Sequence, residues 1–213
     1  MTTAKKSFPG LKISLHSYQD AILWTKFKSG DPDAFATIIS THYKDIYNYG
    51  MRFTSDCEIL KDSMQDIFLL LWKNRQTIGS TNDPKFYLMK ALRRHLRHTL
   101  AKKRILPFSK EVSFESIAGE DTNRQEQLIE DEQLAAYVCK INKAILKLSP
   151  RQQEIIYLRF YAGADMDDIA AVMNIRKQSV YNLLHDALEK LKKSTGNKTG
   201  NHFNALPLLL YFV

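Results

Sequence analysis

Cysteine is almost absent from this sequence, and glycine and proline are scarce. The two cysteines, Cys57 and Cys139, are far apart and form no Cys-x-x-Cys motif. A disulfide-stapled fold is therefore not expected, and a reducing cytoplasm fits this usage. Only 8 glycines and 6 prolines occur in 213 residues, which disfavours an all-β chain with many tight turns.

Long apolar runs and the common catalytic motifs are also missing. The N-terminal residues, MTTAKKSFPG, lack the apolar core of a signal peptide. The longest apolar run near the C-terminus, residues 206–213, is too short to span a bilayer. The sequence contains no phosphate-binding glycine loop, no nucleophile elbow and no complete set of metal ligands at a recognised spacing. We therefore expect no enzyme activity, no metal, no cofactor and no membrane span.

The chain does have an excess of positive charge, and it is unevenly distributed. The formal net charge is +8 and the sequence pI is about 9.3, which indicates a polyanionic partner, either nucleic acid or an anionic membrane. Residues 1–104 hold 18 Lys/Arg and 9 Asp/Glu, residues 105–133 hold 2 and 8, and residues 134–213 hold 11 and 6. This pattern predicts two basic domains joined by an acidic linker.

Hydrophobic residues make up 44% of the chain and recur mostly at helical spacing, so we predict an all-α fold of two small helical domains. The predicted boundaries are 18–104 for the first domain, 105–127 for the linker, 128–193 for the second domain and 194–213 for a polar spacer and an apolar tail.

Helix starts in the first half follow from capping patterns. Asp31 followed by Pro32 is typical of an N-cap with proline at the first helical position. Ser55 with Glu58 matches a capping box. Residues 79–84 predict a loop, and a further helix is expected over 85–104. The helix behind Pro32 is expected to turn six apolar residues to one face: Phe35, Ile38, Ile39, Tyr43, Ile46 and Tyr47.

Helix starts in the second half are equally explicit. Ser149 with Gln152 matches another capping box, and the helix behind it is predicted to run through Tyr161. Gly163 should break that helix, and Asp165 should cap the next one.

The stretch DDIAAVMNIRKQSVYNLL, residues 167–184, predicts two short helices joined by a tight turn at Asn174. The second helix turns apolar side chains inward and polar side chains outward. This pattern is typical of a helix-turn-helix, whose second helix enters the major groove and offers Gln, Asn, Lys or Arg to base edges. Two packed amphipathic helices with a solvated face would give the same pattern, so this stretch alone leaves both interpretations open.

Two other surfaces stand out. From Lys85 to Arg104 there are eight Lys/Arg and no Asp/Glu, beginning next to two aromatic residues, which suits single-stranded nucleic acid as well as a merely solvated face. His95 and His98 have the spacing of a metal pair but no third ligand nearby in the sequence, so surface histidines are predicted. On the preceding helix, Asp62, Gln65, Asp66, Leu69 and Lys73 share one face. This acidic edge could bind a basic protein helix or simply be solvated.

Taken in order, these segments resemble the sigma-70 family of bacterial RNA polymerase initiation factors. The resemblance rests on DSMQDIFLLLW, the loop, the basic helix, the acidic linker and LSPRQQEIIYLRFY followed by the helix-turn-helix. More narrowly, the chain resembles the extracytoplasmic-function (ECF) group, which keeps only regions 2 and 4, and GDPDAF and LWKNR are typical of that group. The general character of the sequence is similar to that of family members from Bacteroidetes. The resemblance covers about residues 23–193.

The resemblance implies a role for each surface in selecting and melting a promoter. The acidic edge would bind the β′ clamp helices of core RNA polymerase, with the β flap as a further contact, through Asp62, Gln65, Asp66 and Leu69. The loop and basic helix would bind the −10 element through Asn82, Lys85, Phe86, Tyr87, Lys90, Arg93, Arg94 and Arg97. The helix-turn-helix would read the −35 element through Arg176, Lys177, Gln178, Ser179, Tyr181, Asn182 and His185. An anti-sigma factor is a further candidate partner.

The sequence departs from the family pattern at three places. Arg93-Arg94-His95 stands where asparagine is frequent, and Arg176 stands near the position where serine or proline often begins the recognition helix. Asp186 replaces a usual basic residue, so it could accept from a cytosine amine or weaken a phosphate contact.

Other interpretations of the sequence remain. The chain could be a stand-alone helix-turn-helix regulator that binds a specific duplex without polymerase, or an RNA- or polymerase-bound structural factor that does not read promoters. The tail, HFNALPLLLYFV, lies outside the resemblance. It could fold back on a domain, occupy a partner's groove or be a disordered end, and one hypothesis is that it closes the second domain onto the first.

Overall fold

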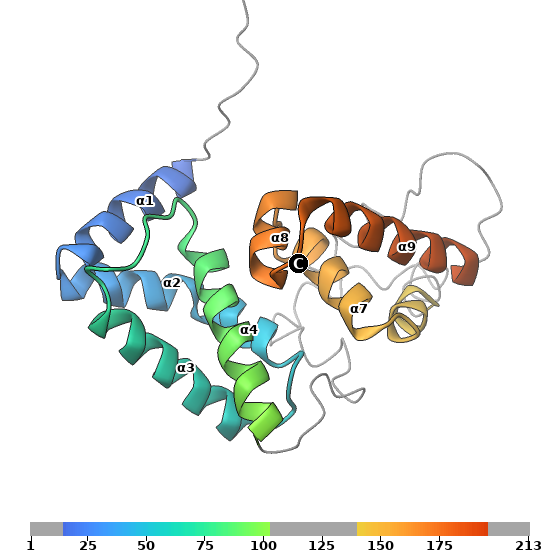
Figure 1. The fold of residues 1–213 in the computed structure, drawn as a ribbon, viewed down its shortest axis with the longest axis horizontal. Coiled ribbons are helices and arrows are strands. Elements are labelled where there is room, and N and C mark those ends of the chain that lie inside the picture. The colour runs from blue at the N-terminus through green and yellow to red at the C-terminus, as the bar shows by residue number, and fades with distance from the viewer. Residues whose placement is uncertain (1–14, 103–139, 196–213) are drawn as a thin grey trace, which may run out of the picture.

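The computed structural model describes residues 15–102 and 140–195, and every regular element in these two ranges is a helix (Figure 1). The predicted all-α fold is therefore confirmed. The predicted linker and the apolar tail lie outside the described residues.

The first half is a bundle of four helices, α1 (Leu15–Lys28), α2 (Pro32–Gly50), α3 (Cys57–Lys73) and α4 (Pro84–Lys102). The helices α2, α3 and α4 pack against one another, and α1 packs on α2 and α4. Their shared core consists of large apolar side chains that are almost fully buried: Trp24, Phe27, Ile38, Ile46, Leu60, Met64, Leu88, Leu92, Leu96 and Leu100.

Two helix starts in this bundle show how capping works and where the prediction was wrong. The Asp31 carboxylate accepts from the backbone N–H groups of Asp33 and Ala34, at 2.9 and 3.1 Å, as predicted. The N-cap of α3, however, is Asp56 rather than Ser55. The Asp56 carboxylate accepts at 3.0 and 3.1 Å from two amides of the first turn. The cap lies one residue later than predicted, so Glu58 is the second helical residue, one short of the position that completes a capping box.

The apolar face predicted for α2 is rotated in the structure. Tyr43 is 42% exposed, whereas His42 and Tyr49 are buried. The reason is tertiary packing. Because α2 contacts α1, α3 and α4, these helices cover more of its surface than the single apolar face that was predicted.

The second half contains helical residues 140–146, then α7 (Pro150–Ile156), the π-helical turn η2 (Tyr157–Tyr161), α8 (Met166–Met173) and α9 (Lys177–Thr195). The capping box at Ser149 is confirmed, with Ser149 and Gln152 bonded reciprocally. The helix predicted to run through Tyr161 widens into the π turn for its last five residues. Gly163 then takes a φ of +72°, where glycine is favoured, and the chain turns into α8.

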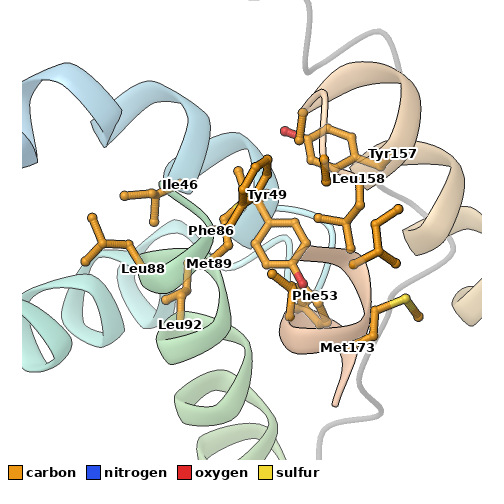
Figure 2. Close-up of a cluster of buried hydrophobic side chains, with 14 of the residues drawn as sticks. Ile46, Tyr49, Phe53, Phe86, Leu88, Met89, Leu92, Tyr157, Leu158 and Met173 are labelled. Carbon is orange, nitrogen blue, oxygen red and sulfur yellow. The ribbon is translucent and has the colours of Figure 1, made fainter. Parts of the chain in front are cut away.

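The two halves pack directly against each other through α4 and α8. Figure 2 shows the result as one cluster of buried side chains, to which Ile46, Tyr49, Phe86 and Leu92 come from the first half, and Tyr157, Leu158 and Met173 from the second. The sequence indicated two separate modules, but in this conformation they share a core.

Candidate nucleic-acid interface

The helix-turn-helix has the local geometry that its sequence predicts. Asp165 caps α8 by accepting from the amides of Asp167 and Asp168, both at 2.8 Å. Asn174 ends the helix in the left-handed conformation, with φ 53° and ψ 54°. After the turn, α9 packs on α7 and α8 through an apolar face. The buried residues of that face are Val180, Leu184, Ala187 and Leu191.

The opposite face of α9 is open to solvent at its N-terminal end. All seven residues assigned to the −35 element by resemblance are exposed and lie in the first half of the helix or just before it: Arg176, Lys177, Gln178, Ser179, Tyr181, Asn182 and His185. This part of a recognition helix is the part that reaches base edges in the major groove.

Polar contacts organise this face. The Gln178 amide donates to the Asn182 side-chain oxygen at 3.1 Å, one helical turn away. Lys177 Nζ donates to the Asp167 carboxylate at 2.8 Å, and this bond raises the pKa of the lysine above its ordinary value. Because Lys177 is exposed, it can exchange that partner for a phosphate at little cost.

The basic helix α4 divides into an exposed side and a buried side. Lys90, Arg94 and Arg97 are exposed on α4, and Asn82 is exposed in the loop before it. Tyr87 is half-buried, with its ring centroid 5.0 Å from that of Trp24. Trp24 in turn donates to the Gly79 carbonyl at 3.0 Å, which ties the loop to α1.

Three residues expected to contact DNA are buried or half-buried in this conformation. Phe86 and Arg93 are each only 7% exposed. Lys85 is half-buried and donates from Nζ to the Ala162 carbonyl at 2.8 Å. In this conformation Phe86 and Arg93 are buried and Lys85 is only partly exposed, and the −10 contacts assigned to these three residues stay a prediction. Arg93 is held by Glu154 of α7, and Lys85 by the carbonyl of Ala162, the residue that follows η2.

Arg93 is held by a buried carboxylate. Its Nε and Nη2 donate to the two Glu154 oxygens at 2.7 and 3.2 Å, and the Tyr49 hydroxyl donates to the same carboxylate at 2.7 Å. Burial lowers the pKa of Arg93, but its bond to Glu154 and the charge of that carboxylate outweigh burial, so the pKa is raised overall. Burial, together with the Glu154 charge, holds the pKa of Tyr49 well above its usual value, so Tyr49 remains a donor.

The acidic edge of α3 forms a second exposed surface. Asp62, Gln65 and Asp66 are exposed, and Leu69 is 69% exposed on the same side of the helix. One Asp66 oxygen lies 3.3 Å from His95 Nε2, and the carboxylate remains accessible. An exposed leucine among carboxylates suits a partner helix that is basic and partly apolar.

Sequence reasoning missed the residues that join the two halves, chiefly Tyr49, Glu154 and Tyr157. One signal was available, because Glu154 precedes the apolar run IIYL, so helical spacing gives this acid apolar neighbours. Its partner could not be inferred, since Arg93 lies 61 residues away.

Within the two described ranges, no three His, Cys, Asp or Glu side chains are grouped as a metal site would require. The same residues include no helix with both the length and the apolarity needed to span a bilayer.

Comparison with known proteins matches two family profiles to the chain. The profile described as Sigma-70 region 2 matches residues 38–105, and the profile described as Sigma-70, region 4 matches residues 140–191. Among curated proteins, the ECF RNA polymerase sigma factor SigL of Mycobacterium tuberculosis is 26% identical over 171 residues, spanning 77% of this chain and 92% of SigL.

Two solved structures share the fold. CnrH, in complex with the cytosolic domain of CnrY, is 17% identical with a TM-score of 0.53, and the match covers 84% of this chain and 99% of CnrH. The sigma factor RpoE of Bartonella quintana, solved with the anti-sigma factor NepR, is 16% identical with a TM-score of 0.54. This match covers 78% of this chain and 98% of RpoE.

The fold and surfaces define a two-domain, all-α protein with a basic helix and a helix-turn-helix. The two family matches fall on these parts in order and together cover more than half of the chain. The chain therefore belongs to the sigma-70 family of transcription initiation factors, in its ECF group. Such a factor binds core RNA polymerase, recognises the −10 and −35 promoter elements and promotes DNA opening.

Proposed function

We propose that this ECF sigma factor performs its three tasks on three separate surfaces: the acidic edge of α3, the loop and exposed side of α4, and the N-terminal half of α9. The observation that carries the proposal is that each surface is exposed, and each has a chemistry suited to a different partner. By itself the chain catalyses no reaction, and the polymerase makes the RNA.

The acidic edge is proposed to bind the β′ clamp helices of core polymerase. Leu69 supplies exposed apolar area, and Asp62, Gln65 and Asp66 supply acceptors around it. DNA would be repelled by these carboxylates, so a basic protein surface is the fitting partner. The β flap is proposed as a second polymerase contact.

The −10 element is proposed to bind the loop at Asn82 and the α4 residues Lys90, Arg94 and Arg97, which are exposed already. Tyr87, half-buried beside Trp24, offers a ring on which an unpaired base can stack, worth roughly 1–3 kcal/mol. This stacking energy offsets part of the DNA stacking energy, roughly 1.4 kcal/mol per base-pair step, that is lost when the duplex opens. Lys85, Phe86 and Arg93 are proposed to join once the two halves separate.

The −35 element is proposed to be read by the exposed face of α9. The Gln178 and Asn182 side chains can bond bidentately to adenine, and Arg176 and Lys177 can bond guanine or phosphate. Asp186 is also exposed on α9, where either of its two proposed effects could occur.

Further proposals complete the assignment. We propose domain boundaries at 18–104 and 128–193, a cytoplasmic location with the polymerase, and membership of a Bacteroidetes-like subgroup. Two solved relatives are in complex with a partner, CnrH with the cytosolic domain of CnrY and RpoE with the anti-sigma factor NepR. An anti-sigma factor is accordingly proposed as a regulator of this chain. A preference for core polymerase from Bacteroidetes over other core enzymes in transcription assays would support the subgroup.

Run-off transcription with core polymerase and a genomic fragment library tests the proposed function. We expect protein-dependent start sites that share two upstream motifs at a fixed spacing. The variant Asp62→Arg/Asp66→Arg should abolish these starts. A matched control is Asp33→Arg/Glu189→Arg, which changes the net charge equally at two acids remote from the α3 edge and should leave the starts in place.

The same experiment separates the alternatives. Specific duplex binding by the free protein with no protein-dependent starts would replace this proposal with a stand-alone regulator. Polymerase binding without any preference between promoter and random DNA would indicate a structural factor.

A further inference from the structure

The buried Arg93–Glu154 pair links the two halves that must act on different DNA elements. Arg93 comes from the −10-binding helix α4, and Glu154 comes from α7 of the domain that carries the helix-turn-helix. Both side chains are nearly inaccessible, 8% and 4% exposed. The Glu154 carboxylate accepts three hydrogen bonds here, including one from Tyr49.

Further contacts surround this pair. Tyr49 stacks on Tyr157 across the two halves, with ring centroids 6.0 Å apart. The Arg52 guanidinium lies over the Tyr157 ring at 4.6 Å. Lys85 is fixed by the Ala162 carbonyl, as described above. Figure 2 shows Tyr49 and Tyr157 within the cluster that both halves share.

The chemistry of the pair suits a reversible lock better than a permanent joint. Removing two charges from water costs solvation free energy, and this cost cancels much of their mutual attraction. A buried pair therefore contributes little net stability while both partners are present. Removing one partner leaves an uncompensated buried charge, which is strongly unfavourable. When the halves separate, Glu154 is hydrated and Arg93 can exchange a carboxylate for a DNA phosphate, with similar bidentate geometry.

Geometry shows that the closed conformation cannot serve both promoter elements. Elements named −10 and −35 lie roughly 25 base pairs apart, or roughly 85 Å of duplex at about 3.4 Å per pair. In the closed chain α4 lies against α8, and α8 lies against α9. Packed helices lie about 8–10 Å apart, so the two DNA-binding faces are on the order of 20–30 Å apart.

We propose that this conformation is an autoinhibited state, in which the Arg93–Glu154 pair clamps the helix-turn-helix domain onto α4 and the −10-binding residues Lys85 and Arg93 are held in contacts with that domain. Core polymerase opens it by holding the two domains apart. The proposal rests on the proposed function, since it assigns α4 to the −10 element.

The direct test uses the full chain with the substitutions Ser194→Cys and Cys139→Ser, and it carries dyes at the two exposed positions 57 and 194. Glu154→Gln removes the charge from the lock but touches no proposed DNA or polymerase surface. Relative to the wild type, energy transfer should fall. The free protein should bind forked DNA carrying the recovered −10 sequence about tenfold more tightly, because a larger fraction is competent to bind.

The matched control is Glu189→Gln, the same chemical change at a partly exposed carboxylate that pairs with Lys193 on α9. It should match the wild type in both readouts. If Glu154→Gln is not folded at the assay temperature, Tyr49→Phe replaces it; this removes one bond to the carboxylate and should shift both readouts less, in the same direction. Wild-type values for whichever of these two variants is folded would overturn the proposal.

A charge exchange distinguishes pairing from general packing. Arg93→Glu should open the chain by placing two carboxylates together, and Arg93→Glu/Glu154→Arg should restore energy transfer towards the wild-type value. No restoration would count against a lock made by this pair. Adding core polymerase to the wild type should lower energy transfer, and a chain that stays closed while run-off transcripts appear would also overturn the proposal. An absence of transcripts would instead refute the proposed function, while the energy-transfer comparisons would still report on the lock.

Discussion

At the scale of single residues, Asp168 carries a pH dependence that follows from its place in the α8 capping box. Burial, and secondly the charge of Asp165, raises its pKa from 3.8 to about 6. The folded chain therefore holds this proton more tightly than the unfolded chain. As pH rises from about 4 to about 6, the unfolded state loses the proton first, so the free energy of unfolding falls through this window.

The variant Asp168→Asn should remove that dependence. The asparagine oxygen can still accept from the Asp165 amide, which Asp168 now bonds at 3.3 Å, but it has no proton to lose. Urea unfolding at pH 4.5 and 7 should show a smaller difference in stability for the variant than for the wild type. An unchanged difference would assign the titration to another group.

Gly50 is a residue whose missing side chain matters for packing. A Cβ at this position would overlap the Leu60 side chain and lie 3.0 Å from a Leu92 methyl group. Because α2, α3 and α4 meet there, Gly50→Ala should lower the free energy of unfolding by about 1–3 kcal/mol. Gly79→Ala, where nothing lies within 4 Å, is the control and should change stability little. Chemical denaturation measures both, and equal stabilities would contradict this account.

At the scale of elements, the start of α3 tests the corrected cap. Asp56→Ala removes the acceptor of two first-turn amides and should cost about 1 kcal/mol. Ser55→Ala should cost little, because that exposed serine is not the N-cap. Thermal denaturation of the two variants gives the comparison, and a larger loss for Ser55→Ala would restore the box predicted from the sequence.

The recognition helix allows a prediction about specificity rather than affinity. Gln178→Ala and Asn182→Ala should relax base preference at one or two positions of the −35 motif, each losing about 1–3 kcal/mol of discrimination. Both residues are exposed and their side chains bond to each other, so the fold should be unaffected. Start-site sequencing measures the motif, with Ser194→Ala at the far end of α9 as control. An unchanged −35 motif in both variants would show that α9 reads it through other side chains.

At the scale of the whole molecule, the shared core predicts coupled unfolding. The described residues of both halves contribute to one continuous buried cluster, and α4 packs on α8. Calorimetry of the wild type should therefore show one cooperative transition. Glu154→Gln should divide it into two, because a buried unpaired guanidinium disfavours the contact between halves. Two transitions already in the wild type would mean that the halves are independent in solution.

The amino-acid sequence by itself determined the helices and the chemistry of their exposed faces. Capping residues such as Asp31, Ser149 and Asp165, and the left-handed Asn174, act through bonds within a few residues, so local sequence is sufficient to predict them. The order of the acidic edge, basic helix and helix-turn-helix could likewise be inferred from the sequence. It indicated the family that the comparisons then showed.

Only the tertiary structure decided how the two halves meet. Arg93 looked like one more cation of a basic helix, and Glu154 like an acid among apolar residues, because nothing local records a partner 61 residues away. Burial of Phe86 and Tyr49, and the rotation of the α2 face, have the same origin. Their partners come from helices that the chain brings together only on folding, and long-range packing outweighs local periodicity where several helices share a core.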